Sequence, residues 1–163
     1  SVLLLPSKKF YQLCLMLVLN FPTYQFRIKN SENTQQIFDI VRKKFVVLQP
    51  EEWVRQHTLQ YLVYEKGYPL SLIGVEKMIL LNGLKKRADI LVYKPNGAIR
   101  LLIECKAPQI KITQLAFDQI ARYNLKFEAD YLMVTNGIEH YYCQMDYEKE
   151  KYTFLKQIPD FSR

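Results

Sequence analysis

Residues 87–106 constrain the fold more than any other stretch, because they read as two apolar strands joined by a turn. The turn is Asn96-Gly97, the strongest short-range hairpin signal in the chain. If the loop closes symmetrically about this pair, the numbers of facing residues sum to 193, as 96 and 97 do. Asp89 then lies directly opposite Glu104. Pro95, which has no N–H, disfavours a two-residue loop, and a longer symmetric loop keeps the same pairing.

Two carboxylates that face each other across antiparallel strands repel, because their Cβ atoms are about 4.5–5.5 Å apart. A divalent cation with oxygen ligands, such as Mg²⁺, relieves this repulsion between Asp89 and Glu104. The same register places Arg87 opposite Lys106, and it places Lys106 on the same face as Glu104. Two acids, a metal ion and an ammonium group suit the attack of water on a phosphodiester.

The alternative is that Asp89, Glu104 and Lys106 are only the solvated ends of an ordinary hairpin. However, the run Leu101–Ile103 directly before Glu104 is continuously apolar, which is typical of a strand buried on both faces. An ionised group at the end of a buried strand needs a compensating interaction. We therefore favour a functional role for the three residues as a set.

Length and composition are those of one globular domain, with 163 residues of which 49% are apolar. The formal net charge of +7 favours a polyanionic partner, either nucleic acid or an acidic membrane surface. Cys14, Cys105 and Cys143 are far apart and lack zinc-ligand spacing, which fits a reducing cytoplasm. His57 and His140 have no serine or cysteine context that would indicate a catalytic triad.

The two ends of the chain read differently from its centre. Residues 1–22 are interpreted as an N-terminal extension, 23–156 as a single domain and 157–163 as a loose C-terminal tail. The apolar run 13–19 is far shorter than the roughly 20 residues of a membrane-spanning helix. No small-residue cleavage site follows it, which argues against a signal peptide. Met16 is a candidate for the natural start of translation.

A first helix is predicted from about 51 to 66, because a proline precedes this range and a glycine follows it. Helical spacing places Glu51, Val54, Thr58 and Leu62 on one face, so we expect Glu51 to point toward the sheet. Glu51 and Glu52 also complement the positive N-terminal end of the helix dipole, and this is the alternative explanation for them.

The predicted strands are 76–81, the two halves of the central hairpin, 130–135, 140–145 and 152–155, with a short strand at 24–28. The segment 37–48 is ambiguous between helix and strand. A basic turn at 84–87 carries Lys85, Lys86 and Arg87 beside the acids, where we expect it to bind the phosphates of nucleic acid. The alternative for this turn is an ordinary solvated loop.

A second helix is predicted over 114–126, with Thr113 as its N-cap. Gln119 and Tyr123 are four residues apart and therefore share one face of this helix. Nothing in the local sequence requires a glutamine and a tyrosine to project together. The alternative is a polar helix face that happens to carry a tyrosine.

In chain order the elements are a helix with Glu51, a strand, a strand with Asp89, a strand with Glu104-Cys105-Lys106, a helix with Gln119 and Tyr123, and a strand. This order resembles the PD-(D/E)xK nuclease superfamily, and most of all the N-terminal nuclease region of type I restriction enzyme R subunits. The resemblance implies an α/β fold, with a restriction-endonuclease-like mixed β-sheet flanked by helices, an α-β-β-β-α-β core and extra N-terminal and C-terminal strands.

The resemblance also implies an endonuclease that hydrolyses DNA with Mg²⁺, for which Mn²⁺ substitutes. Asp89 and Glu104 would bind the metal ion with help from the Cys105 carbonyl. Lys106 would position or activate the attacking water and stabilise the charged transition state. Glu51 would be the acid from the first helix, with Glu52 as the alternative if the helical phase differs by one residue.

Gln119 and Tyr123 match the Q-x-x-x-Y helix motif of the RecB-like and type I branches, where these residues orient the lysine or contact DNA. The first motif departs from the usual pattern, since Ala88 stands where many members have proline before the aspartate. The partners implied are DNA and either a second copy of the chain or another restriction-system subunit, in the cytoplasm and without a membrane.

Two other functions compete with this interpretation. A nuclease-fold module without catalytic activity would bind nucleic acid or a protein partner, yet pure binding does not require opposed carboxylates. A membrane-surface protein would use the early apolar stretch and is the less favoured alternative.

Overall fold

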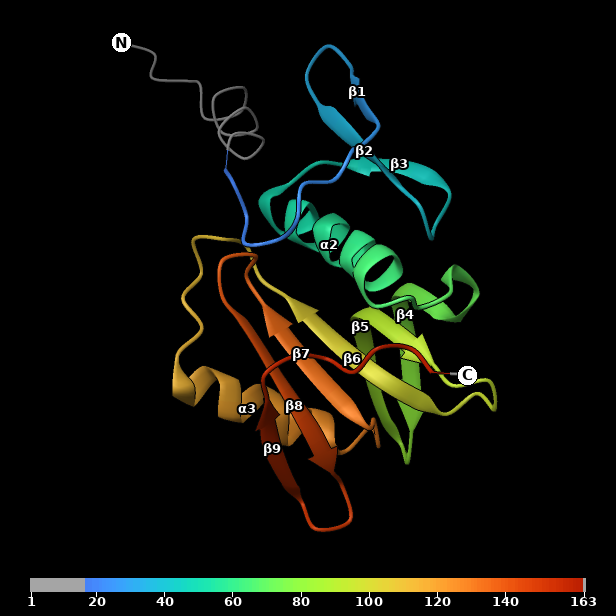
Figure 1. Cartoon of the computed structure of the whole chain (residues 1–163), viewed down its shortest axis with the longest axis vertical. Coiled ribbons are helices and arrows are strands. Elements are labelled where there is room, and N and C mark those ends of the chain that lie inside the picture. The colour runs from blue at the N-terminus through green and yellow to red at the C-terminus, as the bar shows by residue number, and fades with distance from the viewer. Residues whose placement is uncertain (1–16, 163) are drawn as a thin grey trace.

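A computed structural model describes residues 17–162 of the chain. Its centre is a six-stranded sheet in the order β4-β5-β6-β7-β8-β9, with α2 on one face and α3 on the other (Figure 1). β6 and β7 run parallel, and the other neighbouring pairs in this sheet are antiparallel. The strands are β4 (Ile73–Leu81), β5 (Leu84–Tyr93), β6 (Ile99–Cys105), β7 (Tyr131–Thr135), β8 (His140–Asp146) and β9 (Lys151–Leu155).

The helices connect and cover this sheet. α2 (Pro50–Gln60) continues into a π-helical stretch, Tyr61–Glu65, and α3 (Gln114–Leu125) links the parallel strands β6 and β7. A short 3₁₀ turn, Leu70–Leu72, leads into β4. Beyond α2, away from the main sheet, lies a separate antiparallel sheet (Figure 1) of β1 (Ile28–Asn30), β2 (Gln35–Asp39) and β3 (Lys44–Val47). The predicted mixed sheet flanked by helices, with its α-β-β-β-α-β order, is therefore confirmed.

Two apolar clusters, one on each face of the main sheet, form the core. Ile90 and Ile103 face α2, whereas Leu91 and Leu102 face α3. Because the central strands are buried on both faces, their sequences are continuously apolar rather than alternating, as expected for residues 101–103. The helices complete the clusters with Val54, Leu59 and Leu62 from α2 and with Phe117, Ala121 and Leu125 from α3.

Both predicted helices form, and their termini follow the signals in the sequence. α2 begins at Pro50, and Gly67 at its far end has a φ of 72°, a left-handed conformation that suits glycine. Thr113 caps α3, since its side-chain oxygen accepts a hydrogen bond from the Ala116 N–H at 3.1 Å. Of the predicted inward face of α2, Val54 and Thr58 are fully buried, but Glu51 is exposed.

Two local expectations were wrong, and one open alternative is resolved. The turn between β4 and β5 is Asn82-Gly83, with φ of 50° and 76°, so residues 84–87 belong to a strand and not to a loop. The ambiguous segment 37–48 forms most of the hairpin of β2 and β3. The early strand begins at Ile28, whereas it was expected at 24–28.

The described chain ends pack against the domain. Leu19 is 5% exposed and belongs to the cluster beneath α2, and the Asn20 N–H donates to the Gly137 carbonyl at 2.7 Å. After Gln157 the chain crosses the α2 side of the sheet (Figure 1), with Ile158 buried and the Tyr68 hydroxyl donating to the Pro159 carbonyl. The expectation of a loose tail is therefore wrong for the described residues. The predicted domain bounds themselves stay a prediction.

Residues 1–16 lie outside the described part, and with them most of the apolar run 13–19, Met16 and Cys14. Within residues 17–162, no helix is long and apolar enough to cross a membrane.

The packing of the C-terminal segment predicts that Ile158→Ala destabilises the domain by about 2–4 kcal/mol, because it leaves a cavity in the core. Urea denaturation of the variant measures this loss. Lys156→Ala, two residues earlier and exposed, is the matched control and is expected to leave the midpoint unchanged. Equal midpoints for both variants would contradict a docked segment.

Candidate active site

The predicted register of the central hairpin is confirmed in its middle. Ile90 pairs with Ile103 and Val92 with Leu101, so the paired numbers sum to 193. The register shifts by one residue beside the loop, where Tyr93 pairs with Ile99. The loop is a tight turn closed by the Gly97 N–H and the Lys94 carbonyl at 2.9 Å, with Pro95 at its second position, where no N–H is needed.

The alternation of side chains breaks at Asp89. In the ladder between β4 and β5, Val75 pairs with Ile90 and Lys77 with Ala88, but Glu76 and Asp89 between them do not pair. Ala88 packs toward α3 and Ile90 toward α2, although a regular strand would place both on one face. Irregularities of this kind are common next to active sites.

The backbone on the β4 side of this break is strained. Glu76 has a φ of 52°, a conformation that costs a residue other than glycine about 1–2 kcal/mol. The irregularity also corrects one expectation. Arg87 pairs with Met78 on β4 and is exposed, so it does not face Lys106.

Two hydrogen bonds hold the Asp89 carboxylate. One oxygen accepts from the Arg55 guanidinium on α2 at 3.1 Å, and the other accepts from the Cys105 backbone N–H on β6 at 2.9 Å. The side chain is 20% exposed. Asp89 is therefore fixed between α2 and the end of β6. For Cys105 the structure shows this N–H contact, and metal binding by its carbonyl stays a prediction.

Glu104 lies on the α3 side of the sheet, because its neighbours Ile103 and Cys105 both pack toward α2. Its carboxylate forms an ion pair with the Lys86 ammonium, and its side chain is 13% exposed. Burial raises the pKa of Glu104, the ion pair with Lys86 lowers it, and the negative charge of Asp89 raises it further. The expected pairing of Asp89 directly opposite Glu104 is not formed in the strand ladder, because Asp89 turns to Arg55 on α2 while Glu104 lies on the α3 side. The two charges still interact, as the pKa of Glu104 indicates.

Glu51 and Lys106 belong to the same electrostatic neighbourhood. Burial and the charge of Asp89 raise the pKa of Glu51, while Arg55 and Lys106 lower it. The positive charge of Lys106 also lowers the pKa of Glu104. No ion pair of Lys106 is found within residues 17–162.

Glu52 occupies a different environment from Glu51. Its side chain is 8% exposed and forms ion pairs with Arg42 and Arg55, whereas the Glu51 side chain is 48% exposed. An acid that is paired twice and buried is suited to holding the structure together. Of the two candidates, Glu51 is the one that a ligand can reach.

Sequence reasoning missed Arg55, which organises the site. Its guanidinium is 7% exposed and lies within 4 Å of the carboxylates of Glu51, Glu52, Glu76 and Asp89. The available signal was the spacing of Glu51 and Arg55, an i, i+4 pair on the helix next to the buried Val54. That spacing is common on exposed helices, so it does not by itself indicate a functional arginine.

Of the two residues of the Q-x-x-x-Y motif, only Tyr123 lies near the predicted acids. Lys86 Nζ lies 5.4 Å from the centroid of the Tyr123 ring, so Tyr123 stands beside the ion pair of Glu104. Gln119 is exposed, and its side chain has no hydrogen bond within the described residues. The structure therefore connects Tyr123 to the acids through Lys86.

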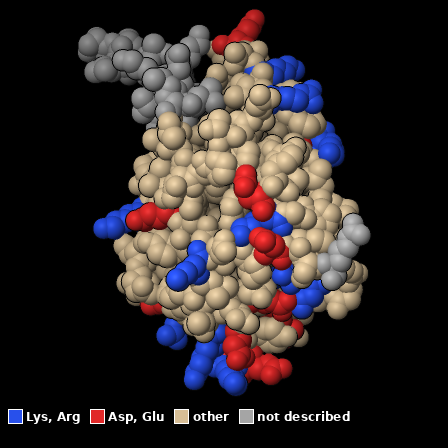
Figure 2. Space-filling model, viewed as in Figure 1, with Lys and Arg blue, Asp and Glu red and all other residues tan. Residues whose placement is uncertain are grey.

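The three basic residues 85–87 do not act as one cluster. Lys86 points toward α3 and Glu104, whereas Lys85 and Arg87 are exposed on the other face of β5. Figure 2 shows cationic and anionic side chains interspersed over the face drawn there, without a continuous basic surface. Any contact with nucleic acid must then be local rather than spread over this face.

Hard oxygen donors are present for a magnesium ion, because Asp89 and Glu104 are carboxylates and such ligands suit this cation. Among the described residues, no three His, Cys, Asp or Glu side chains are gathered closely enough to hold a metal ion. Protein cations neutralise the two carboxylates, since Arg55 pairs with Asp89 and Lys86 with Glu104. The donor chemistry fits the ion, provided that at least one of these cations moves.

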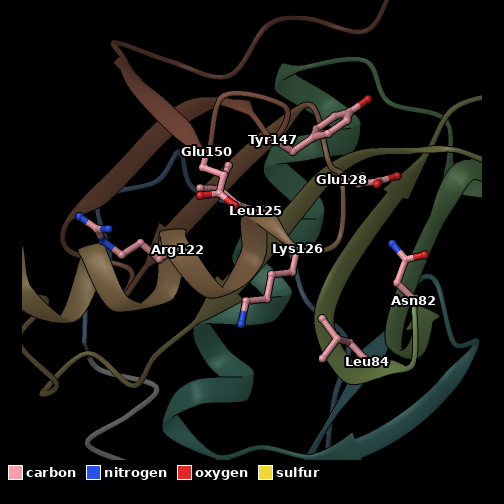
Figure 3. Close-up of a pocket in the computed structure, with 8 residues that line it drawn as sticks. All are labelled: Asn82, Leu84, Arg122, Leu125, Lys126, Glu128, Tyr147 and Glu150. Carbon is pink, nitrogen blue, oxygen red and sulfur yellow. The ribbon is translucent and has the colours of Figure 1, made fainter.

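A cavity of about 470 Å³ opens elsewhere, beside the C-terminal end of α3 (Figure 3). Two basic and two acidic side chains line it, so it has no preference for an anion. None of the predicted site residues lines it. The lining residues are Asn82, Leu84, Arg122, Leu125, Lys126, Glu128, Tyr147 and Glu150.

Comparison with known proteins identifies the family. Residues 50–159 match the family described as the N terminus of the type I restriction enzyme R protein, over well more than half of the chain. The chain belongs to this family. Its matched region includes Arg55, Lys86 and all the predicted catalytic residues. No curated protein matches the chain.

Among solved structures, the chain is similar to a fragment assigned to an HsdR subunit of a type I restriction enzyme from Vibrio vulnificus. The two are 18% identical, with a TM-score of 0.47, over 69% of this chain and 24% of that one. The chain therefore spans about a quarter of the length of that fragment.

The contacts of Arg55 predict that Arg55→Met destabilises the fold by about 3–5 kcal/mol, because it leaves buried carboxylates without their cation. Guanidinium chloride denaturation measures the change in the free energy of unfolding. Arg122→Met, at an exposed position of α3, is the control and should change stability little. Similar midpoints for the two variants would show that Arg55 does not hold the site together.

Proposed function

We propose that this chain is a divalent-metal-dependent endonuclease that hydrolyses DNA phosphodiester bonds, as part of a restriction system. The observation that supports the proposal best is that Arg55 contacts the carboxylates of both Glu51 and Asp89, while Asp89 also accepts a hydrogen bond from the Cys105 N–H, next to Glu104 and Lys106 in the chain. The family, the N-terminal region of type I restriction R proteins, agrees with this role.

The charge balance of the site also supports a divalent cation. With every group ionised, six carboxylates stand against four cations, which leaves two negative charges, the amount that one Mg²⁺ or Mn²⁺ neutralises. The carboxylates are those of Asp39, Glu51, Glu52, Glu76, Asp89 and Glu104, and the cations are Arg42, Arg55, Lys86 and Lys106.

In the proposed mechanism Asp89 and Glu104 would hold the metal ion, and the Cys105 carbonyl would be a further ligand. When bound, the ion supplies a Lewis acid for the phosphoryl oxygens and lowers the pKa of a coordinated water. Lys106 places its ammonium beside the reacting phosphate and stabilises the negative charge that develops there. Glu51, which contacts Arg55 at 3.6 Å and is exposed, would accept a hydrogen bond from the attacking water.

Tyr123 contributes by keeping a cation beside Glu104, and Gln119, one turn earlier on α3, is positioned to contact DNA that reaches this helix. Lys85 and Arg87, exposed on one face of β5, are the basic residues that we assign to the DNA backbone. Lys86, which lies between them in the chain, instead pairs with Glu104. A module that binds DNA without cutting it is the alternative, and the two experiments below separate these functions.

The first experiment is cleavage of supercoiled plasmid in Mg²⁺ or Mn²⁺ by the wild type, Glu104→Gln and Lys106→Met. Loss of the metal ligand or of the ammonium is expected to lower the rate about a hundredfold or more. Glu128→Gln and Lys111→Met, exposed residues with the same charge changes, are the controls. Equal cleavage by the site variants, or no metal-dependent cleavage by the wild type, would exclude the enzymatic function.

The second experiment measures DNA binding by fluorescence anisotropy at several salt concentrations, with Ca²⁺ or without metal. Replacing both Lys85 and Arg87 by glutamine should weaken binding and reduce the slope of log K against log salt by about 2. The pair Lys149→Gln and Lys151→Gln, exposed residues in the turn after β8 and at the start of β9, removes the same charge from another place. If both double variants lower the slope equally, β5 is not the contact surface.

A further inference from the structure

The two cations that neutralise the predicted metal ligands are held very differently. Arg55 contacts four carboxylates, and an arginine remains charged at any accessible pH. Lys86 contacts one carboxylate, that of Glu104. A divalent ion that enters the site therefore meets one cation that loses four partners when it leaves, and another that loses a single partner.

Lys86 also has an alternative position for its charge. The face of the Tyr123 ring lies 5.4 Å from its Nζ, and an aromatic ring attracts an ammonium group at this distance. Tyr123 is 40% exposed, so an ammonium that moves over the ring gains solvent. The lysine stem is long and flexible, which allows its charge to swing while the backbone of β5 stays in place.

We propose that Lys86 is a counter-ion which competes with the divalent cation for Glu104 and moves onto Tyr123 when the metal binds. Lys86 is then a positioning residue that sets the metal affinity of the site, while Arg55 remains on Asp89 throughout. This inference rests on the proposed metal-dependent function. It also gives the tyrosine of α3 a defined role, as the place that receives the displaced ammonium.

Competition predicts an effect opposite to that of structural damage. If Lys86 only supported the fold, its removal would weaken metal binding, because the ligands would be less well held. If Lys86 competes with the metal, its removal strengthens binding, because the ion no longer has to break an ion pair. The sign of the change therefore decides between the two roles.

The experiment is calorimetric titration of the full chain with MnCl₂. Lys86→Met is expected to bind Mn²⁺ about tenfold more tightly than the wild type. Lys126→Met is the matched control, since Lys126 Nζ lies 5.8 Å from the centroid of the same Tyr123 ring and has no ion pair within the described residues. This control should stay within about twofold of the wild type, because Lys126 is exposed and Glu104 pairs with Lys86 and not with Lys126, so the ion breaks no contact of Lys126 when it binds.

Three further variants test whether the gain in Mn²⁺ affinity arises from the loss of the ion pair between Lys86 and Glu104. Lys86→Arg keeps the charge and should show no gain. Adding Glu104→Gln to Lys86→Met should abolish the gain, because the ligand itself is lost. Tyr123→Leu removes the receiving ring and should weaken Mn²⁺ binding about threefold. Lys86→Gln, which can still donate a hydrogen bond to Glu104, replaces Lys86→Met if that variant does not fold.

Unchanged or weaker Mn²⁺ binding by Lys86→Met, or an equal gain in Lys126→Met, overturns the inference. Failure of every protein, including Lys86→Met, to bind Mn²⁺ overturns it as well. Tighter binding by Lys86→Met together with no cleavage of any DNA supports the inference and rejects the proposed nuclease activity. The two proposals can therefore fail separately.

Discussion

The contact between Arg55 and Asp89 is the interaction on which the rest of the site depends. Asp89 lies where β5 changes the face to which its side chains point, and Glu76 opposite it takes a left-handed backbone conformation. Such an irregularity persists only where surrounding contacts compensate for its cost. Arg55 supplies them, because its guanidinium reaches the carboxylates of both Glu76 and Asp89 from α2.

The same network connects the site to the small sheet. Arg42, in the turn between β2 and β3, pairs with Glu52 on α2 and with Glu76 on β4. Asp39, which is fully buried, accepts hydrogen bonds from two backbone N–H groups, from Arg42 and from Gln56 on α2. The small sheet therefore braces α2 from its outer side, and through α2 it fixes the direction in which Arg55 points.

Most of the secondary structure was predictable, because it follows from local signals that tertiary packing did not override. A proline and a glycine bound the first helix, a threonine caps the second, and Asn96-Gly97 closes the central hairpin. The register of that hairpin follows from the position of its turn. The segment 37–48 was not predictable, since its apolar residues fit both periodicities and only packing beside α2 resolves them.

The candidate site was predictable as a set of residues but not as a set of contacts. The acids lie at the ends of buried strands, where an ionised side chain needs a compensating partner and therefore indicates a site. Their partners depend on an irregularity that alternation cannot reveal. A regular strand would place Lys86 on the face of the sheet opposite to Glu104. The C-terminal segment is a separate case, because Ile158 packs in a site that is formed by distant elements of the chain.

The irregularity of β5 at Asp89 explains the orientation of the residues on both sides of it. Residues after Asp89 keep the register expected from the turn, so Ile90 pairs with Ile103. Residues before Asp89 have the opposite orientation, which turns Lys86 toward α3 and Glu104. If the side chains of β5 alternated regularly through Asp89, Arg87 would point toward α3 in place of Lys86. Glu104 would then lose its ion pair with Lys86. The strain at Glu76 thus gives the buried acid its counter-ion, and the fixed Arg55 keeps that arrangement in place.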